Sequence, residues 1–283
     1  MTPREAIEQA TEFRVVDVKF CDPAGNWHHV SIPAASLSPR HFDVGLPTDR
    51  GRVVPDPSFA FADPFPEQPT LSLVGGTGGD DDPRAVAERV QRRHPHLALS
   101  ARIGFHLFDD VRWEVSPQTV RHALDSAEGV WNAGRDGSEN AGCPVAGGQP
   151  VAPADQLHDL RTEAMLALLD VGVAVFGHRR GSAPGSAELS VGAQPPRALA
   201  DTWMLVRYFA RNVARLNGRT ATFMPCPLGG EEGARIALRV EGVADPRAFA
   251  SGIVARRAPL CAFASANAFR RPSGTALVDA WVE

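Results

Sequence analysis

The sequence predicts an α+β protein in which a small N-terminal sheet precedes a larger α/β part. Two alternating runs, residues 14–21 and 26–32, are joined by the turn D-P-A-G-N and predict a pair of strands. Residues 75–83, G-G-T-G-G-D-D-D-P, separate two composition regimes and are expected to form a solvated linker. Since 283 residues fit either one large domain or two, we use this segment as the boundary and predict domains at 1–80 and 81–283.

The N-terminal elements follow from local patterns. Apolar residues of the two runs are expected to bury one face of a small sheet: Val15, Val18 and Phe20 against Trp27, Val30 and Ile32. A short helix over residues 34–37 and a strand over residues 70–74 complete this part.

Helices in the C-terminal part are marked by caps and apolar stripes. The first, over residues 83–94, begins with Asp82 as N-cap and Pro83 in its first turn. The second, over residues 155–171, has Asp155 as its predicted cap. Two more are expected over residues 198–216, ending at Asn217-Gly218, and over residues 245–256. On the second helix we expect exposed ion pairs of small value from Asp159, Arg161 and Glu163.

Between these helices the pattern predicts strands over residues 99–110, 173–178, 187–191, 235–240 and 275–282. The first of them, L-S-A-R-I-G-F-H-L-F-D-D, is unusual. Because side chains alternate along a strand, one face is wholly apolar: Ala101, Ile103, Phe105 and Leu107. The other face carries Arg102 and His106, spaced by Gly104, which indicates either an ordinary half-exposed strand or a binding site.

Composition and charge exclude several classes of protein. With 43% hydrophobic residues, 22% charged residues and a net charge of -4, the chain is typical of a globular protein that does not bind nucleic acid. No apolar run reaches the length of a membrane span, and the N-terminus is too polar for a signal peptide, so we expect a cytoplasmic location. The abundance of arginine and alanine suggests a GC-rich bacterial genome.

Cysteine and lysine usage narrows the chemistry. The four cysteines, at positions 21, 143, 226 and 261, form no C-x-x-C pair, which argues against disulfides and thiolate zinc. Lys19 is the only lysine and lies in a strand-like run, so neither Schiff-base chemistry nor a phosphate-binding P-loop is favoured.

Several longer motifs carry a family resemblance. T-A-T-F-M-P-C-P at residues 220–227 and P-V-A-P-A-D-Q-L-H-D-L-R-T-E-A-M at residues 150–165 are similar to motifs in the catalytic domain of the glutamine synthetase family. V-P-D-P-S-F-A-F-A-D-P-F at residues 54–65 looks like the end of its N-terminal domain, and L-F-D-D at residues 107–110 fits its metal-binding strand. The resemblance implies a β-grasp-like N-terminal domain packed on a glutamine-synthetase-like catalytic α/β domain, truncated here. That family builds rings with active sites between subunits and makes an amide from a carboxylate, ATP and an amine through an acyl phosphate.

The chain departs from the family pattern at the residues that carry this chemistry. The family motif E-P-E is replaced by Arg102-Ile103-Gly104, and H-H-H-E by the H-R-R-G of residues 178–181. Only Glu188 is left to match a metal-binding glutamate, and the motif N-G-S-G-M-H-C-H corresponds to residues 232–239, where both histidines are lost.

Further departures concern three segments of the family. The lysine of T-F-M-P-K-P is Cys226 here. The family's F-D-G-S-S loop, which reaches into a neighbouring protomer of the ring, is missing between His41 and Arg50. The sequence stops at Glu283, before the family's catalytic arginines and last metal glutamate. We therefore expect a homo-oligomer smaller than the family's double ring.

Replacement of acidic residues by arginine predicts a cavity that is positive without a metal. We expect Arg102, Arg180 and Arg239 to bind a small anionic metabolite, with His106 or His178 as acid–base group oriented by Glu188, and no metal or cofactor. Two alternatives stay open: a non-catalytic pseudoenzyme that scaffolds a partner protein, and a residual carboxylate–amine ligase that still needs Mg²⁺ and ATP. Whether the chain is an enzyme is left open by the sequence.

Overall fold

The structure is a computed structural model that describes residues 1–23, 25–134, 149–224, 227–228, 234, 236–255 and 278–281. Within these residues no helix is both long and apolar enough to cross a membrane. Contacts group the described residues into two compact units. The first contains Met1–Leu97 and Pro195–Met204, and the second contains Ala98–Gln194 together with the described residues from Leu205 onward. A domain boundary at residue 80 stays a prediction.

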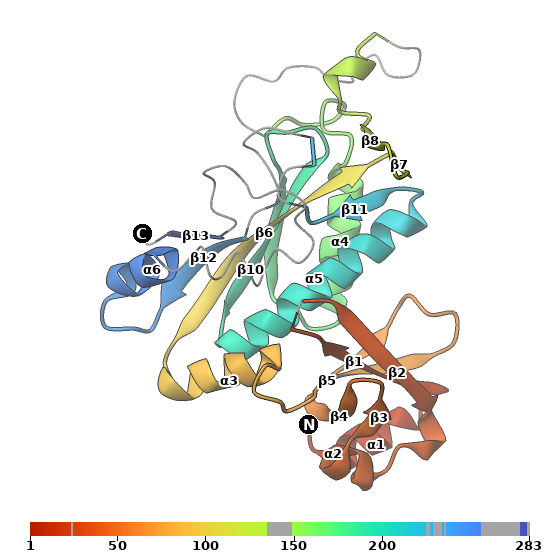
Figure 1. The fold of residues 1–283 in the computed structure, drawn as a ribbon, viewed down its shortest axis with the longest axis vertical. Coiled ribbons are helices and arrows are strands. Elements are labelled where there is room, and N and C mark those ends of the chain that lie inside the picture. The colour runs from red at the N-terminus through yellow and green to blue at the C-terminus, as the bar shows by residue number, and fades with distance from the viewer. Residues whose placement is uncertain are drawn as a thin grey trace. The chain divides into compact units, whose positions relative to one another are not determined.

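The first unit is built on a mixed sheet with the strand order β2-β1-β5-β4-β3. Its strands are β1 (Val15–Cys21), β2 (Trp27–Pro33), β3 (Leu46–Thr48), β4 (Gly51–Asp63) and β5 (Thr70–Gly76). The predicted pair of β1 and β2 is confirmed as antiparallel, whereas β1 and β5 run parallel (Figure 1). The sheet also contains the long strand β4, whose pattern is hidden by the many prolines of residues 41–70.

Short helices cover the buried face of this sheet. They are α1 (Pro3–Ala10), a 3-10 turn (Ala34–Ser36) and α2 (Pro39–Val44). Thr2 begins α1 with a capping box that it forms with Glu5. The core cluster joins apolar residues of the strands and of both helices, among them Val16, Val18, Phe20, Ala6 and Phe42.

Asp82 caps α3 (Pro83–Arg93) as predicted and accepts a hydrogen bond from the backbone N–H of Arg84 at 2.9 Å. Its other carboxylate oxygen accepts from the N–H of Gly78 at 2.9 Å, and the residue is only 3% exposed. Gly75 and Gly76 belong to β5. The expectation of a solvated linker is therefore wrong for these parts of residues 75–83, because the cap and the strand order the backbone.

The second unit is built on a sheet with the strand order β13-β12-β6-β10-β9, to which β11 adds by pairing with β6 (Figure 1). Its strands are β6 (Ala98–Phe108), β9 (Val175–Arg180), β10 (Ser186–Gln194), β11 (Thr220–Thr222), β12 (Ile236–Glu241) and β13 (Val278–Trp281). The apolar face predicted for β6 is confirmed, since Ala101, Ile103, Phe105 and Leu107 are all buried.

The helices of this unit are α4 (His158–Asp170), the second part of α5 (Pro196–Leu216) and α6 (Pro246–Ala255), with a 3-10 turn at Val130–Asn132. α4 packs on β9 and β10. The predicted end of α5 is confirmed, because Gly218 adopts a positive φ of 68°. Asp155 is not the cap of α4: Leu157 holds that position without a side-chain hydrogen bond.

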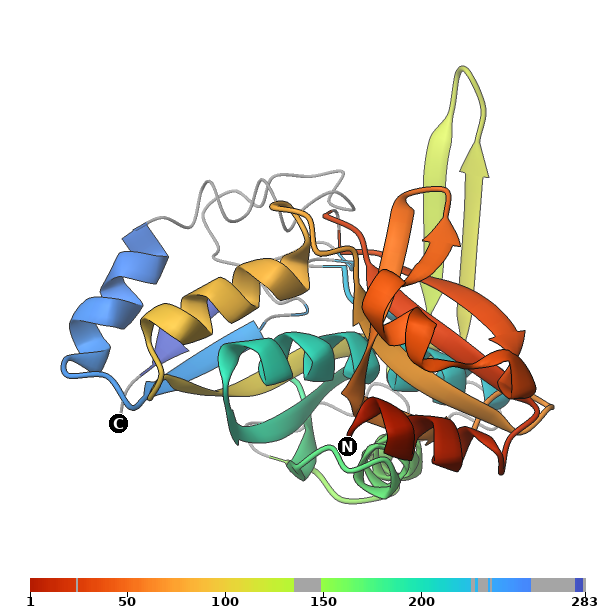
Figure 2. The same cartoon turned by 90° about the horizontal axis from the view of Figure 1, so that it is seen from below.

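The strands β7 (Asp110–Val115) and β8 (Val120–Asp125) form a separate hairpin after β6. Figure 2 shows it as a long two-stranded ribbon that stands away from the six-stranded sheet. Trp113 on this ribbon is 73% exposed.

Candidate functional site

The register of the central strands places Arg102 and Glu188 on one face of the six-stranded sheet. Arg102 of β6 lies opposite Ser190 of β10, and Gly104 lies opposite Glu188. Directly paired residues project to the same side, so this face carries a guanidinium and a carboxylate on neighbouring strands. Arg102 is half-buried there.

Arg239 of β12 belongs to the same face. It lies opposite Ser100, which is two residues before Arg102 on β6, so the two arginines are diagonal neighbours across the strand pair. Arg239 Nε lies 3.3 Å from Glu241 Oε1 on its own strand. The face thus brings together two of the three predicted anion-binding arginines.

His106 also follows the alternation of this face, but it is only 1% exposed. It lies opposite Ser186 of β10 and Thr222 of β11, and its ring stacks on Phe108 with centroids 5.9 Å apart. Burial of this degree makes the imidazole part of the core of the sheet rather than an exposed group on its surface.

His178 and Arg180 are on the opposite face. They pair with Leu189 and Ala187 of β10, which alternate with Glu188 along the strand. The structure therefore does not bring the predicted site residues into one cavity. The physical reason is the register of β9, which a single sequence does not reveal.

Arg179, the residue between these two, reaches the face that carries Glu188. Its Nε lies 2.7 Å from Glu188 Oε1, and its Nη2 donates to Oε2 at 3.1 Å. The two side chains thus form an ion pair that contains one charge-assisted hydrogen bond. Arg179 is not among the predicted site residues. Because side chains alternate along a strand, Arg179 projects to the sheet face opposite to that of His178 and Arg180.

The family resemblance implies divalent cations at this face, so we tested whether the described residues fit them. Mg²⁺ and Mn²⁺ need several oxygen ligands. Glu188 and Glu241 each lie within ion-pair distance of an arginine. No group of three or more His, Cys, Asp or Glu side chains suited to a metal occurs in the described part of the chain. The described residues do not fit a carboxylate-held divalent cation.

The opposite face holds a polar cluster around the half-buried His178. Arg161 of α4 donates from Nη2 to Asp155 and from Nε to His178 Nδ1 at 3.3 Å. Thr162 Oγ1 lies 2.9 Å from His178 Nε2. The expectation that Arg161 lies on the helix surface is wrong, because the residue is only 1% exposed and is held by partners outside its helix.

Burial lowers the pKa of His178 below its ordinary value, and the adjacent guanidinium of Arg161 lowers it further. Both ring nitrogens face hydrogen-bonding partners within the cluster. The neighbouring His158 ring meets the His178 ring edge-on, with centroids 5.1 Å apart.

Arg180 has a structural partner of its own on this side. Its Nε lies 3.1 Å from Glu128 Oε2, and the same oxygen accepts from the N–H of Gly185 at 3.0 Å. Glu128 is buried, so this pair fixes the turn between β9 and β10 to the segment after the hairpin.

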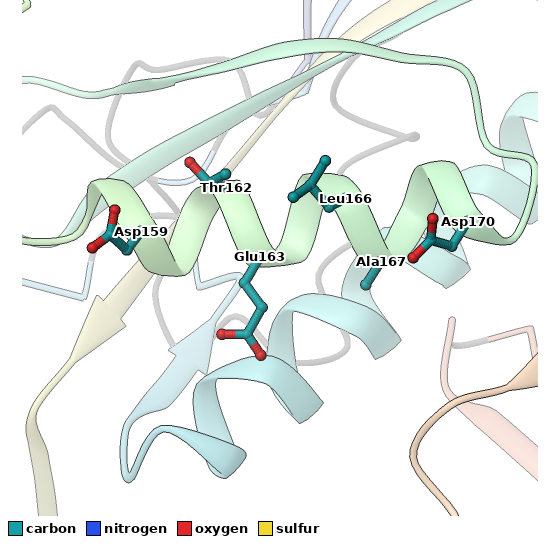
Figure 3. A pocket seen from close by; sticks show the side chains of 6 residues that line it. All are labelled: Asp159, Thr162, Glu163, Leu166, Ala167 and Asp170. Carbon is teal, nitrogen blue, oxygen red and sulfur yellow. The ribbon is translucent and has the colours of Figure 1, made fainter.

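A surface groove lies along α4, outside the predicted site. Asp159, Thr162, Glu163, Leu166, Ala167 and Asp170 line it (Figure 3). Glu163 accepts a hydrogen bond from Asn217 Nδ2 at 2.9 Å, next to the end of α5. Among the groove residues, Thr162 contacts the predicted site residue His178.

Some sequence-based predictions lie outside the described residues. They concern Cys143, Cys226 and Cys261, residues 232–233 and 235 of the substituted motif, and residues 275–277 and 282 of the strand expected over residues 275–282.

The chain is thus an α+β protein. It has one unit with a six-stranded sheet that carries arginines on one face, and one unit with a five-stranded mixed sheet. The glutamine synthetase catalytic domain family matches residues 80–238, more than half of the chain. The chain is 33% identical over 266 residues to a glutamine synthetase of Methylococcus capsulatus. The aligned region covers 82% of this chain and 57% of that protein. The chain therefore belongs to the glutamine synthetase family, as a divergent member.

Other relatives extend this finding. A 3-hydroxylaminophenol mutase of Cupriavidus pinatubonensis is 32% identical over 253 residues, covering 78% of this chain and 54% of that protein. The fold matches a Plasmodium falciparum glutamine synthetase solved by cryo-electron microscopy, with a TM-score of 0.79 and 16% sequence identity. The match covers 94% of this chain and 62% of that chain. The chain spans a little over half the length of these two curated relatives.

Proposed function

We propose that this glutamine-synthetase-like chain has lost the metal and ATP chemistry of its family and binds a small anionic metabolite on the arginine-bearing sheet face. Arg102 and Arg239 would hold the anion by charge-assisted hydrogen bonds. The observation that carries the proposal is the pairing of Glu188 with Arg179 on the same face. The Arg179 guanidinium pairs with the one carboxylate that the family resemblance assigns to a metal ion.

The comparison with named relatives is compatible with a changed reaction. The protein of Cupriavidus pinatubonensis is named for a mutase, although it is about as similar to this chain as the glutamine synthetases are. This supports a family member with a different activity, but it favours no particular substrate for this chain. The proposal therefore commits only to an anionic group, a carboxylate or a phosphate.

Titration calorimetry with inorganic phosphate and with succinate tests the proposal. The variant Arg102→Ala should weaken binding by at least about tenfold, since one charge-assisted hydrogen bond contributes roughly 1.5–3 kcal/mol. Arg102→Glu reverses the charge and should abolish binding. Arg112→Ala, which removes an exposed arginine of the hairpin, is the matched control and should bind as the parent does.

Equal binding by the parent and both Arg102 variants would show that this face does not hold the anion, and would favour a non-catalytic scaffold. Titration with Mg-ATP distinguishes a residual ligase from the other two functions, because only the ligase must bind the nucleotide. Elemental analysis should find no stoichiometric magnesium or manganese. A tightly held divalent ion would contradict the proposal and favour the ligase.

We further propose that the chain forms a homo-oligomer smaller than a double ring. The basis is the absence of the F-D-G-S-S loop between His41 and Arg50. Light scattering measures the mass directly, and the mass of a dodecamer would show that this loop is not needed for that assembly.

A further inference from the structure

A chain of hydrogen bonds connects α4 to β9 through the polar cluster around the half-buried His178. Arg161 Nη2 donates to Asp155, and Arg161 Nε donates to His178 Nδ1 at 3.3 Å. His178 Nε2 lies 2.9 Å from Thr162 Oγ1, and the Thr162 hydroxyl donates to the carbonyl of His158 at 3.0 Å. Asp155 and Arg161 are both buried.

These contacts determine where the proton of His178 lies. A guanidinium has only donors, so His178 Nδ1 must accept from Arg161. The single hydroxyl hydrogen of Thr162 is directed to the carbonyl of His158, so its oxygen accepts from Nε2–H of His178. The imidazole is therefore neutral and carries its proton on Nε2.

A second proton on His178 meets no acceptor among the groups of the cluster. It would be placed on Nδ1, facing the donor Nε of Arg161, and would put two cations side by side. Within the described part of the chain, the carboxylate next to this ring is that of Asp155, which already pairs with Arg161, and His158 adds a second imidazole. On the strands, the pairing partner of His178 is the apolar Leu189, and Arg180 lies on the same face.

We propose that Asp155, Arg161, His178 and Thr162 form a pH-sensitive clamp that holds β9 against α4 while His178 is neutral and releases it when His178 is protonated. The argument for this clamp does not depend on whether an anion binds on the other face. The lowered pKa of His178 agrees with it. A histidine whose pKa is lower in the folded than in the unfolded chain stabilises the fold fully above the ordinary value of about 6.5, and this contribution is lost as the pH falls toward the folded pKa.

Release would also reach the other face of the sheet. Arg179 follows His178 directly on β9 and holds Glu188 of β10. Movement of β9 away from α4 would therefore change the pairing of Glu188, which couples acidification to the arginine-bearing face.

Hydrogen exchange with mass spectrometry, corrected for intrinsic exchange rates, tests the clamp at pH 7.5 and pH 5.5. The parent should lose protection at lower pH in β9 and the facing part of α4, and more so than in β6. His178→Asn retains an oxygen that accepts from Arg161 but does not titrate, so its protection in β9 should not change with pH. His122→Asn on the exposed hairpin is the matched control and should behave as the parent does.

Protection of β9 that is unchanged between the two pH values in the parent would overturn the proposal, as would the same loss in His178→Asn. If His178→Asn does not fold, nitrogen NMR of the parent protein tests the clamp instead. The His178 ring should show the Nε2–H tautomer at pH 7.5 and titrate below the ordinary histidine value of about 6.5. An Nδ1–H tautomer, or titration at the ordinary value, would likewise refute the clamp.

Discussion

Replacement of Arg161 by methionine should destabilise the protein strongly, because it leaves the buried carboxylate of Asp155 without its cation. Arg161 is 1% exposed and Asp155 is 8% exposed, so neither charge is well hydrated in the folded chain. Removal of one member of such a pair costs about 3–5 kcal/mol. Since 1 kcal/mol shifts the melting temperature of a chain of this size by roughly 2–4 °C, Arg161→Met should lower it by about 6–20 °C.

The double variant Asp155→Asn, Arg161→Met separates the charge effect from lost packing. It removes both charges, so its free energy of unfolding should exceed that of Arg161→Met although it carries one more substitution. Urea unfolding at pH 7.5, followed by circular dichroism, measures both variants against the parent. A loss below about 1 kcal/mol in Arg161→Met, or strictly additive losses in the double variant, would refute the argument that the buried pair is coupled.

Three further stability changes follow from the same structure, each measured by urea unfolding. Lys19→Met should cost about 3–5 kcal/mol, because it removes the cation that lies 3.0 Å from the buried carboxylate of Asp63; a cost near zero would contradict this. Arg84→Lys should destabilise by about 1–3 kcal/mol, since lysine cannot make the two 2.8 Å bonds to Asp201, and stability equal to the parent's would argue against it. Gly185→Ala should cost more than about 1 kcal/mol, because Gly185 has a φ of 72° and a Cβ would lie 2.3 Å from a backbone oxygen; an unchanged midpoint would disprove it.

The sequence predicted the elements whose signals are local. The pair β1 and β2 follows from alternation around one turn, α3 from Asp82 and Pro83, and the end of α5 from Asn217-Gly218. Each signal rests on steric or hydrogen-bonding preferences of a few consecutive residues, which the rest of the fold leaves unchanged. The motifs that resemble glutamine synthetase extended this to the family and its fold.

Partners distant in sequence were not accessible in this way. Spacing on α4 suggested that Arg161 is exposed. In the structure, Arg161 donates hydrogen bonds to Asp155 and to His178, which lies seventeen positions further along the chain. The same Asp155 has the residue type and place of an N-cap. Its role as the partner of a buried guanidinium depends on the packing of α4 against β9, which local propensity does not encode.

The amino-acid sequence by itself determined which charged residues this family member carries and which family motifs it has replaced. Only the tertiary structure decided how they are divided between the two faces of the sheet: Arg102, Glu188 and Arg239 on one, His178 and Arg180 on the other. Side chains alternate with a period of two, so the pairing register of β9 with β10 fixes the face of each residue. A shift of one position would exchange the faces, and that register is set by long-range packing.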